Sequence, residues 1–380
     1  MPWKVAPMSD LRHAAVHKVL TLNLPVAQVA REFGVSRKTI YKWIERRRMR
    51  PDEPLEDHSR RPRHSPNQTQ LTVQQYVLQV RDNYGWGARK IRAFLKQHEP
   101  QLELPSVRTI TKILGRTGRI TPSVSEPAPT PLCFERAAPH QLWQCDHKGP
   151  LEVARQTVHP FTILNDHSRD LIDCQACTDL TTRTAFDILW NAFGEVGLPE
   201  TILCDNAFGT RFQVPHTLSW LEARLVRLGI RPIHGRPYHP QTQGKVERLH
   251  GTLQREVWPH IRRDDIGHFQ HDLDHWRQEI YNTLRPHEAI GDVPPLSRFT
   301  PSPRPRPDKL PPVEYPADAI TRKVNTSGDV RFGGYRILAG RGLVGEFVRI
   351  EPRDHELALY YTHQQIRCLS NEQLVKGKML

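Results

Sequence analysis

Two proline-rich stretches mark boundaries between parts of this chain. Residues 120–140 contain five prolines, and residues 294–316 contain nine in 23 positions. Proline lacks a backbone N–H and disrupts helix interiors and central strands, so neither stretch can continue a regular element. We therefore predict Pro-rich linkers over 120–140 and 293–318. The rest of a 380-residue chain is long enough for several domains with cores of their own.

The excess positive charge lies in the first part of the chain. The whole sequence has 54 Lys and Arg against 41 Asp and Glu; residues 1–120 hold 23 basic and 10 acidic residues, and the remainder holds 31 of each. A basic region ahead of a neutral body is typical of a protein that holds nucleic-acid phosphates at one end. A merely solvated basic surface is the alternative interpretation.

Residues 1–50 have the pattern of a helix-turn-helix DNA-binding domain. Apolar residues recur at helical spacing from Leu11, and Ser36 is suited to cap a helix over 37–48 whose apolar stripe is Ile40, Trp43 and Ile44. In this motif the first turns of the second helix reach base edges in the major groove. The candidate base-reading residues are therefore Arg37, Lys38, Tyr41 and Lys42.

A second helical DNA-binding domain is predicted over 69–119, with helices at 71–84, 86–97 and 106–114. The basic linker between the two domains, 51–68, resembles arms that follow a DNA backbone or enter the minor groove, although a plain spacer is the alternative. The candidate DNA contacts are Arg60, Arg61 and Arg63 in the linker, and Arg108, Thr109 and Lys112 in the last helix.

The rest of the chain changes to mixed α/β and then to β sequence. Over 141–292, short apolar runs predict strands at 142–145, 161–164, 171–176, 201–204 and 230–233, and helices at 181–195, 218–228, 243–257 and 268–281. Alternation over 319–380 predicts a small C-terminal β module that closes into a barrel. The predicted fold class is multidomain: an all-α N-terminal region, an α/β core and a small β-barrel-like module.

Three acidic residues of the α/β part stand where strand and helix ends can converge. Asp146 and Asp205 each follow a predicted strand, and Glu247 lies near the start of a predicted helix. Taken singly, an Asp that closes a strand is more often a turn former or a helix cap. Phosphoryl transfer on DNA, however, requires hard oxygen ligands for two Mg²⁺ ions roughly 3.5 to 4 Å apart. Together the three carboxylates predict a catalytic metal site.

The residues around these carboxylates resemble the insertion-sequence transposases of the retroviral-integrase-like Asp-Asp-Glu class. Trp143-Gln144-Cys145-Asp146-His147-Lys148-Gly149 is similar to the first motif of that class, and Asp205-Asn206 to the second. The third and most specific block is Tyr238-His239-Pro240-Gln241-Thr242-Gln243-Gly244-Lys245-Val246-Glu247-Arg248. Further similarity at 1–4, 34–38, 86–90 and 330–334 extends the resemblance over nearly the whole chain.

The resemblance implies an RNase H-like core, dependence on Mg²⁺ with Mn²⁺ as a substitute, nicking that exposes a 3′-OH at the ends of a mobile element, and joining of that 3′-OH to target DNA. Double-stranded DNA is then the partner, and holding two ends together requires at least a homodimer. By resemblance His239, Gln241, Gln243 and Lys245 position DNA, or else only shape the loop before the helix. Arg248 is expected to contact phosphate or an acidic neighbour.

The sequence departs from this class after Asp205. Ala207 stands where the class usually has Gly, residues 208–215 look like a short insertion, and Asp205 and Glu247 are 42 positions apart, more than is usual. Ala is more strained than Gly where φ is positive, so Asp205 is displaced and the enzyme slowed if the turn requires a positive φ, whereas nothing is lost if the insertion re-routes the loop. An active enzyme is favoured. The alternatives are a catalytically inactive DNA-binding regulator derived from a transposase, and a nuclease of the same fold.

Composition indicates where the protein is located, and sequence context argues against two apparent motifs. No apolar run approaches the roughly 20 residues of a membrane span, no apolar leader begins the chain, and six cysteines are sparse, so we expect a cytoplasmic, nucleoid-associated protein without membrane contact. Residues 340–345 match a dinucleotide-binding pattern, but a strand is predicted after them where a helix is required. Cys174 and Cys177 have metal spacing but no second pair.

Overall fold

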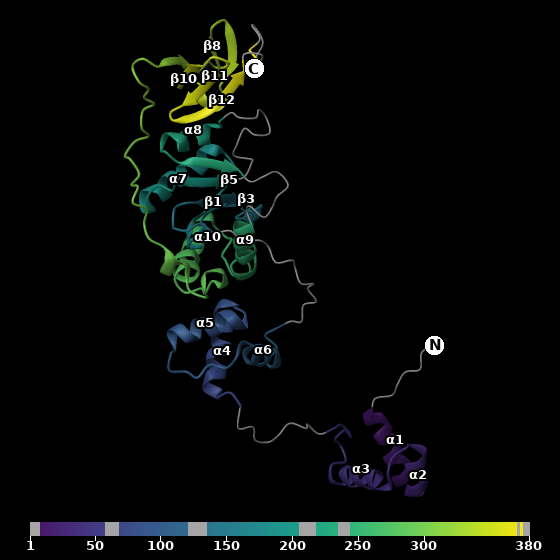
Figure 1. The fold of residues 1–380 in the computed structure, drawn as a ribbon. Helices are drawn as coiled ribbons and strands as arrows, with labels where there is room; N and C mark the ends of the chain where they lie inside the picture. The colour runs from purple at the N-terminus through teal and green to yellow at the C-terminus, as the bar shows by residue number, and fades with distance from the viewer. Residues whose placement is uncertain are drawn as a thin grey trace. The chain divides into compact units, whose positions relative to one another are not determined.

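The computed structural model describes residues 8–57, 68–120, 135–204, 218–234, 244–370 and 373–374. The chain divides into two compact units, Met1–Gln68 and Thr69–Leu380. Figure 1 gives the labels of the helices and strands along the chain.

The first unit is a bundle of three short helices. These are α1 (Met8–Leu20), α2 (Val26–Glu32) and α3 (Arg37–Met49). Ser36 caps α3 as predicted, because its hydroxyl accepts a hydrogen bond from the Thr39 amide at 3.1 Å. The small core of the unit consists of Ala15, Val16, Val29, Ala30, Ile40, Ile44 and Leu55. Leu55 comes from the predicted linker, so the start of that segment is part of the first unit.

Three further helices open the second unit. They are α4 (Leu71–Tyr84), α5 (Ala88–His98) and α6 (Val107–Arg116), packed around Trp86, Ile91, Leu95 and Ile110. Ser106 caps α6 through the Thr109 amide at 3.2 Å. Both capped helices therefore begin with Ser, carry Thr three positions later and bury the Ile that follows. The two helical domains use the same local rule to start their exposed helices.

A mixed sheet forms the centre of the second unit. Its strands are β1 (Trp143–His147), β2 (Leu151–Val153), β3 (Gln156–Asn165), β4 (Leu171–Cys177), β5 (Thr201–Cys204) and β6 (Arg231–His234). β3 pairs antiparallel with β1, β2 and β4, whereas β1, β5 and β6 run parallel. The sequence analysis did not predict β2.

Helices cover both faces of this sheet (Figure 1). α7 (Thr182–Val196) and α8 (Trp220–Arg227) pack on the face that presents Cys145, Ile163 and Ile202. α9 (Gly244–Glu256), α10 (Ile266–His275) and the π-helical turn η3 (Trp276–Asn282) pack on the face that presents Leu164 and Leu171. Because neighbouring residues of a strand point to opposite faces, β3 contributes to both cores.

The helical domain of the second unit contacts α9. Lys90 of α5 lies 3.1 Å from the carboxylate of Glu256, and Arg285 contacts the same carboxylate at 2.9 Å. Burial raises the pKa of Glu256, but hydrogen bonds from Arg285 and Lys90 outweigh it and lower that pKa overall. The end of α9 is therefore held by two cations.

The predicted second linker runs along the core. It follows the 3₁₀ turn η4 (Glu288–Ile290), contains the 3₁₀ turn η5 (Pro295–Arg298), and has no further helix or strand over residues 299–318. Its backbone bonds to the end of α7, with Ser302 N to Val196 O at 2.8 Å and Leu198 N to Arg304 O at 2.7 Å. Arg306 donates to the Trp190 carbonyl at 2.9 Å. This part of the chain is thus fastened to α7.

The C-terminal β module consists of two small sheets. One contains β7 (Ile320–Lys323), β10 (Phe347–Pro352), β11 (Glu356–Tyr361) and β12 (Gln364–Ser370); the other contains β8 (Asp329–Phe332) and β9 (Tyr335–Leu338). Between β9 and β10 lies the 3₁₀ turn η6 (Arg341–Leu343). As predicted, a strand and not a helix follows the glycines at 340–345. Closure of the module into a barrel stays a prediction.

Candidate active site

The sheet brings the positions before two of the predicted carboxylates into register. Cys145 of β1 pairs with Cys204 of the parallel strand β5. Asp146 is the next residue of β1, and Asp205 follows Cys204 in the sequence. Parallel neighbours end at the same edge of a sheet, so a candidate site lies at this edge. Asp205 itself is outside the described residues.

Asp146 is held by contacts on its backbone and side chain. Its side chain is 22% exposed, and its Oδ2 lies 3.9 Å from Nδ1 of His250 on α9. The hydroxyl of Thr162 donates to the Asp146 carbonyl at 3.0 Å and lies 3.0 Å from His250 Nε2. Since that hydroxyl has one proton, its oxygen accepts from the Nε2–H of His250. β1, β3 and α9 are therefore joined at Asp146.

His250 is a neutral residue of this site. Burial, reinforced by the charges of Lys148 and His147, lowers the pKa of His250 to about 4. The sequence analysis missed His250. The available signal was its position, because it follows Glu247 by three residues and so lies on the same side of a helix.

Glu247 is exposed in the first turn of α9. Val246, Leu249 and His250 around it are buried. The helix thus fixes its backbone against the sheet while leaving the carboxylate accessible. Arg248 is also exposed, beside Glu247. His250 links β1, which carries Asp146, to α9, which carries Glu247.

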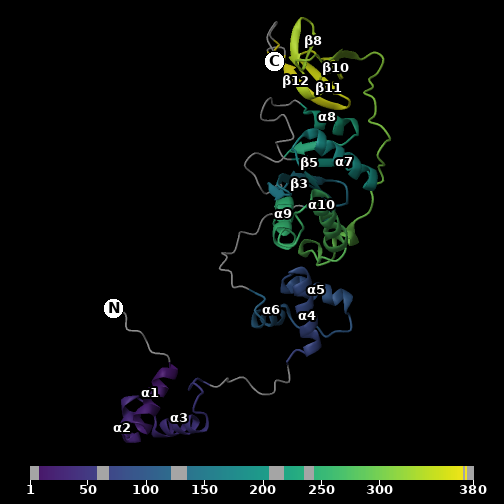
Figure 2. The same ribbon diagram turned by 180° about the vertical axis from the view of Figure 1, so that it is seen from behind.

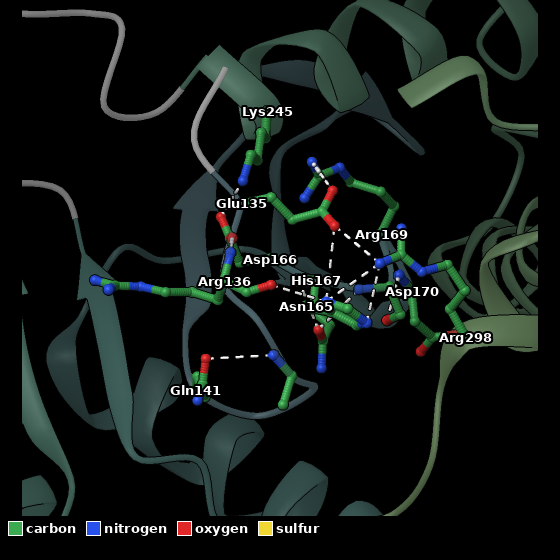
Figure 3. A network of polar contacts seen from close by, with 12 residues as sticks. Glu135, Arg136, Gln141, Asn165, Asp166, His167, Arg169, Asp170, Lys245 and Arg298 are labelled. Carbon is green, nitrogen blue, oxygen red and sulfur yellow. Dashed lines mark hydrogen bonds and ion pairs between the residues drawn. The ribbon is translucent and has the colours of Figure 1, made fainter. Parts of the chain in front are cut away.

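Lys245 has a partner inside the fold. Its ammonium pairs with Asp166, which is fully buried and also accepts from Gln144 Nε2 at 2.7 Å and from the Arg136 amide at 2.9 Å. Figure 3 shows Lys245 directed at this network from α9. Burial lowers the pKa of Lys245, against the effect of Asp166. The structure therefore gives Lys245 a role in seating the start of α9.

The predicted DNA-reading residues of the helical domains lie on exposed surfaces. Arg37, Lys38, Tyr41 and Lys42 of α3 are exposed, as are Arg108 and Lys112 of α6. Thr109 is half-buried and its amide and hydroxyl both contact Ser106. Thr109 thus serves the start of its helix, whatever else it contacts.

Several predicted positions lie outside the described residues. They are Arg60, Arg61, Arg63, Asp205, Ala207, the insertion at 208–215, His239, Gln241 and Gln243. Among the residues that the structure does describe, no cluster of three or more His, Cys, Asp or Glu side chains could hold a metal ion. One of the three predicted ligands is not in that set.

Family models match most of the region built from these elements. Two models of the integrase core domain match residues 136–240 and 228–295. The chain carries an integrase core. In front of the integrase core, two models of the homeodomain-like domain match residues 9–55 and 39–114. The predictions of N-terminal helix-turn-helix domains and an RNase H-like core are confirmed.

A curated relative comes from a mobile element. It is an uncharacterised 39.2 kDa protein of insertion element IS476 from Xanthomonas euvesicatoria, 22% identical over 157 residues. The match covers 41% of this chain and 43% of the relative, so it spans less than half of either protein.

Solved structures similar to the chain include viral integrases. A simian T-cell lymphotropic virus intasome in complex with the PP2A regulatory subunit B56 gamma has a TM-score of 0.36 and 16% identity, over 78% of this chain and 99% of that chain. The HTLV-2 integrase catalytic core domain in complex with magnesium has a TM-score of 0.31 and 16% identity, over 43% of this chain and 97% of that chain. Within the described ranges, no helix combines the length and apolar character that a membrane crossing requires.

Proposed function

We propose that this protein is a DNA transposase. The helix-turn-helix domains at 1–50 and 69–119 bind the ends of a mobile element, and the integrase core at 141–292 nicks those ends and joins them to target DNA. The observation that carries the proposal is the pairing of Cys145 with Cys204, one residue before Asp146 and Asp205, beside a helix that carries Glu247. A cytoplasmic, nucleoid-associated location follows from this function.

The donor set fits hard divalent cations. Asp146, Asp205 and Glu247 supply carboxylate oxygens, the ligands that Mg²⁺ prefers, and Mn²⁺ accepts the same ligands. Two such ions, when bound, would activate the attacking oxygen and stabilise the leaving oxygen. His250 stays neutral beside Asp146, so it adds no positive charge to repel a cation there.

The proposed reaction has two steps at phosphorus, and residues of the chain hold the carboxylates that serve both. In nicking, a water oxygen forms a bond to phosphorus and the bond to the 3′ oxygen breaks, which leaves a 3′-OH on the element. In joining, that 3′ oxygen bonds to a target phosphorus and a target 3′ oxygen leaves with a proton. Thr162 and His250 fix Asp146, and the pair of Lys245 with Asp166 seats α9 and therefore Glu247.

The deciding experiment incubates the purified protein with element-end DNA and a target plasmid, with Mg²⁺, with Mn²⁺ and with EDTA. We expect metal-dependent nicked ends and joined products from the wild type. Specific end binding without products would indicate a regulator derived from a transposase. Cutting without joining would indicate a nuclease of the same fold.

Substitutions of the three carboxylates test the site itself. Asp146→Asn, Asp205→Asn and Glu247→Gln should each abolish nicking and joining, because each removes a charged oxygen ligand and little volume. End binding, measured by gel shift, should be unchanged, since the helical domains are untouched. Asp264→Asn, at an exposed carboxylate outside the site, is the matched control and should nick normally. Full cleavage by any one of the three variants would remove that residue from the site.

A further inference from the structure

Two segments of the integrase core connect the candidate site to described elements. Residues 205–217, which begin with Asp205, join β5 to α8, and residues 235–243 join β6 to α9, which carries Glu247. The first segment therefore ends at the N-terminal turn of α8, and the second begins after His234. A contact between the first turn of α8 and His234 would therefore fix the described residues that flank both segments.

A buried side-chain contact joins these two points. Oε1 of Glu222, in the first turn of α8, lies 2.7 Å from Nε2 of His234. The other carboxylate oxygen of Glu222 accepts from the Ser219 amide at 2.7 Å and completes a capping box. The side chains of His234 and Glu222 are 7% and 10% exposed.

The contacts of Glu222 determine the charge of its carboxylate. Burial raises the pKa of Glu222, but the hydrogen bonds from His234 and Ser219 outweigh it, so the pKa is lowered and the carboxylate is ionised. His234 also pairs in the sheet with Cys204, the residue before Asp205. Its Nδ1 is buried without a hydrogen-bond partner in the described part of the chain. Among the described residues, Glu222 is therefore the hydrogen-bond partner of the ring.

The C-terminal β module rests on the same turn of α8. At Gly342 of η6, a Cβ would overlap the backbone of Leu218, Ser219 and Trp220. Leu343 packs in one core with Leu218 and with Ala223 of α8. Figure 2 shows the module against α8 from behind. The module thus has a shared core with the integrase core.

We propose that Glu222 and His234 are positioning residues of the candidate active site, and that the C-terminal module supports them by its docking on α8. The pair fixes His234, the last residue of β6 and the partner of Cys204 in the sheet, against the first turn of α8, and so steadies the strand end that leads into Asp205. This inference rests on the proposed function, because Glu222 and His234 can position the site only if its carboxylates are the catalytic ones.

The test compares Glu222→Ala, His234→Ala and the double variant with wild type in the full chain. Neither residue bonds to a carboxylate of the site, so we expect nicking rates to fall and the Mg²⁺ needed for half-maximal nicking to rise by roughly 10-fold, the lower end of the effect of removing a ligand's own partner. End-binding affinity should not change. The double variant should be no worse than either single variant, because the two residues act as one unit.

Matched variants separate positioning from general damage. His234→Gln still offers an N–H to Glu222 and should restore most of the activity, and it replaces His234→Ala if that variant fails to fold. The control is the exposed pair Asp264 and His268, 3.1 Å apart, whose alanine variants should nick like wild type. Gly342→Ala should give the same raised Mg²⁺ requirement, whereas Gly115→Ala, where a Cβ meets open space, should not.

Mn²⁺ binding by calorimetry provides a readout that does not depend on catalysis. We expect His234→Ala to bind Mn²⁺ more weakly than wild type. An unchanged Mg²⁺ requirement together with unchanged Mn²⁺ binding would overturn the inference and leave the transposase proposal standing. If the wild type forms no products at all, the proposed function fails, and the Mn²⁺ affinities alone decide whether Glu222 and His234 position metal ligands.

Discussion

Asp170 is a buried carboxyl group whose charge is poorly balanced. It lies between β3 and β4, is 5% exposed, and has a side-chain oxygen without a hydrogen-bond partner in the described residues. Burial raises the pKa of Asp170 to about 7, against the opposing effect of Arg277. A carboxyl group in this position makes the fold sensitive to pH.

The sign of that sensitivity can be predicted. The folded-state pKa lies above the ordinary value of 3.8, so the folded protein binds an extra proton between about pH 4 and pH 7, and stability falls as pH rises through that range. Asp170→Asn cannot ionise. Its stability relative to wild type, measured by urea unfolding, should therefore be higher at pH 8 than at pH 5. An equal difference at both pH values would contradict this account.

Arg37 tests base reading at the scale of one side chain. If this exposed residue of α3 contacts a base, Arg37→Ala should weaken binding to element ends by about 1 to 3 kcal/mol and leave binding to unrelated DNA nearly unchanged. Quantitative gel shifts on both DNAs measure the difference. Equal loss on both would identify a phosphate contact, and Arg31→Ala on α2 is the control.

At the scale of elements, the edge strand β4 is covered by side chains instead of another strand. Gln270 of α10 accepts from the Ala176 amide at 2.7 Å and donates to the Cys174 carbonyl at 3.0 Å. Asn282 makes the corresponding pair of bonds to Leu171, at 2.9 and 3.0 Å. Arg277 donates to the Ile172 carbonyl. The free backbone groups of this edge are thereby satisfied.

Gln270→Ala tests how much these side-chain hydrogen bonds to β4 contribute to the stability of the fold. The substitution leaves one amide and one carbonyl of β4 without their partners, which should lower the free energy of unfolding by about 1 to 3 kcal/mol. Gln278→Ala, at an exposed glutamine of η3, is the matched control and should change stability little. Denaturant unfolding of both variants makes the comparison, and similar stability of the two would show that water replaces Gln270 without loss.

The elements that sequence could predict are those with local signals. Ser36 and Ser106 mark helix starts by their own hydrogen bonds, and the apolar run of β5 marks a buried strand. β2 has three residues and is defined by its pairing with β3, which no local pattern reveals. In the candidate site, the carboxylates could be proposed from motifs, whereas the contacts of His250 with Thr162 and of Glu222 with His234 arise only through tertiary packing.

At the scale of the whole molecule, the proposed function requires two copies of the chain to hold two element ends. We expect gel shifts and sizing on end DNA to show at least a dimer for each pair of ends, because one candidate site serves each end. A monomer on a synapsed pair of ends would refute this. Protein labelled at two different masses would count the copies directly.

The side chains that cover β4 also affect how two copies of the chain can associate. Backbone pairing at an open sheet edge is indifferent to side chains, so it admits unrelated strands as readily as identical ones. With Gln270, Arg277 and Asn282 occupying this edge, two copies cannot join by extending the sheet at β4, and any contact between copies there must fit through side chains. Fits of that kind are particular to a sequence. If the protein is the transposase proposed above, contacts at this edge would favour pairing of identical copies over pairing with a copy from a diverged element.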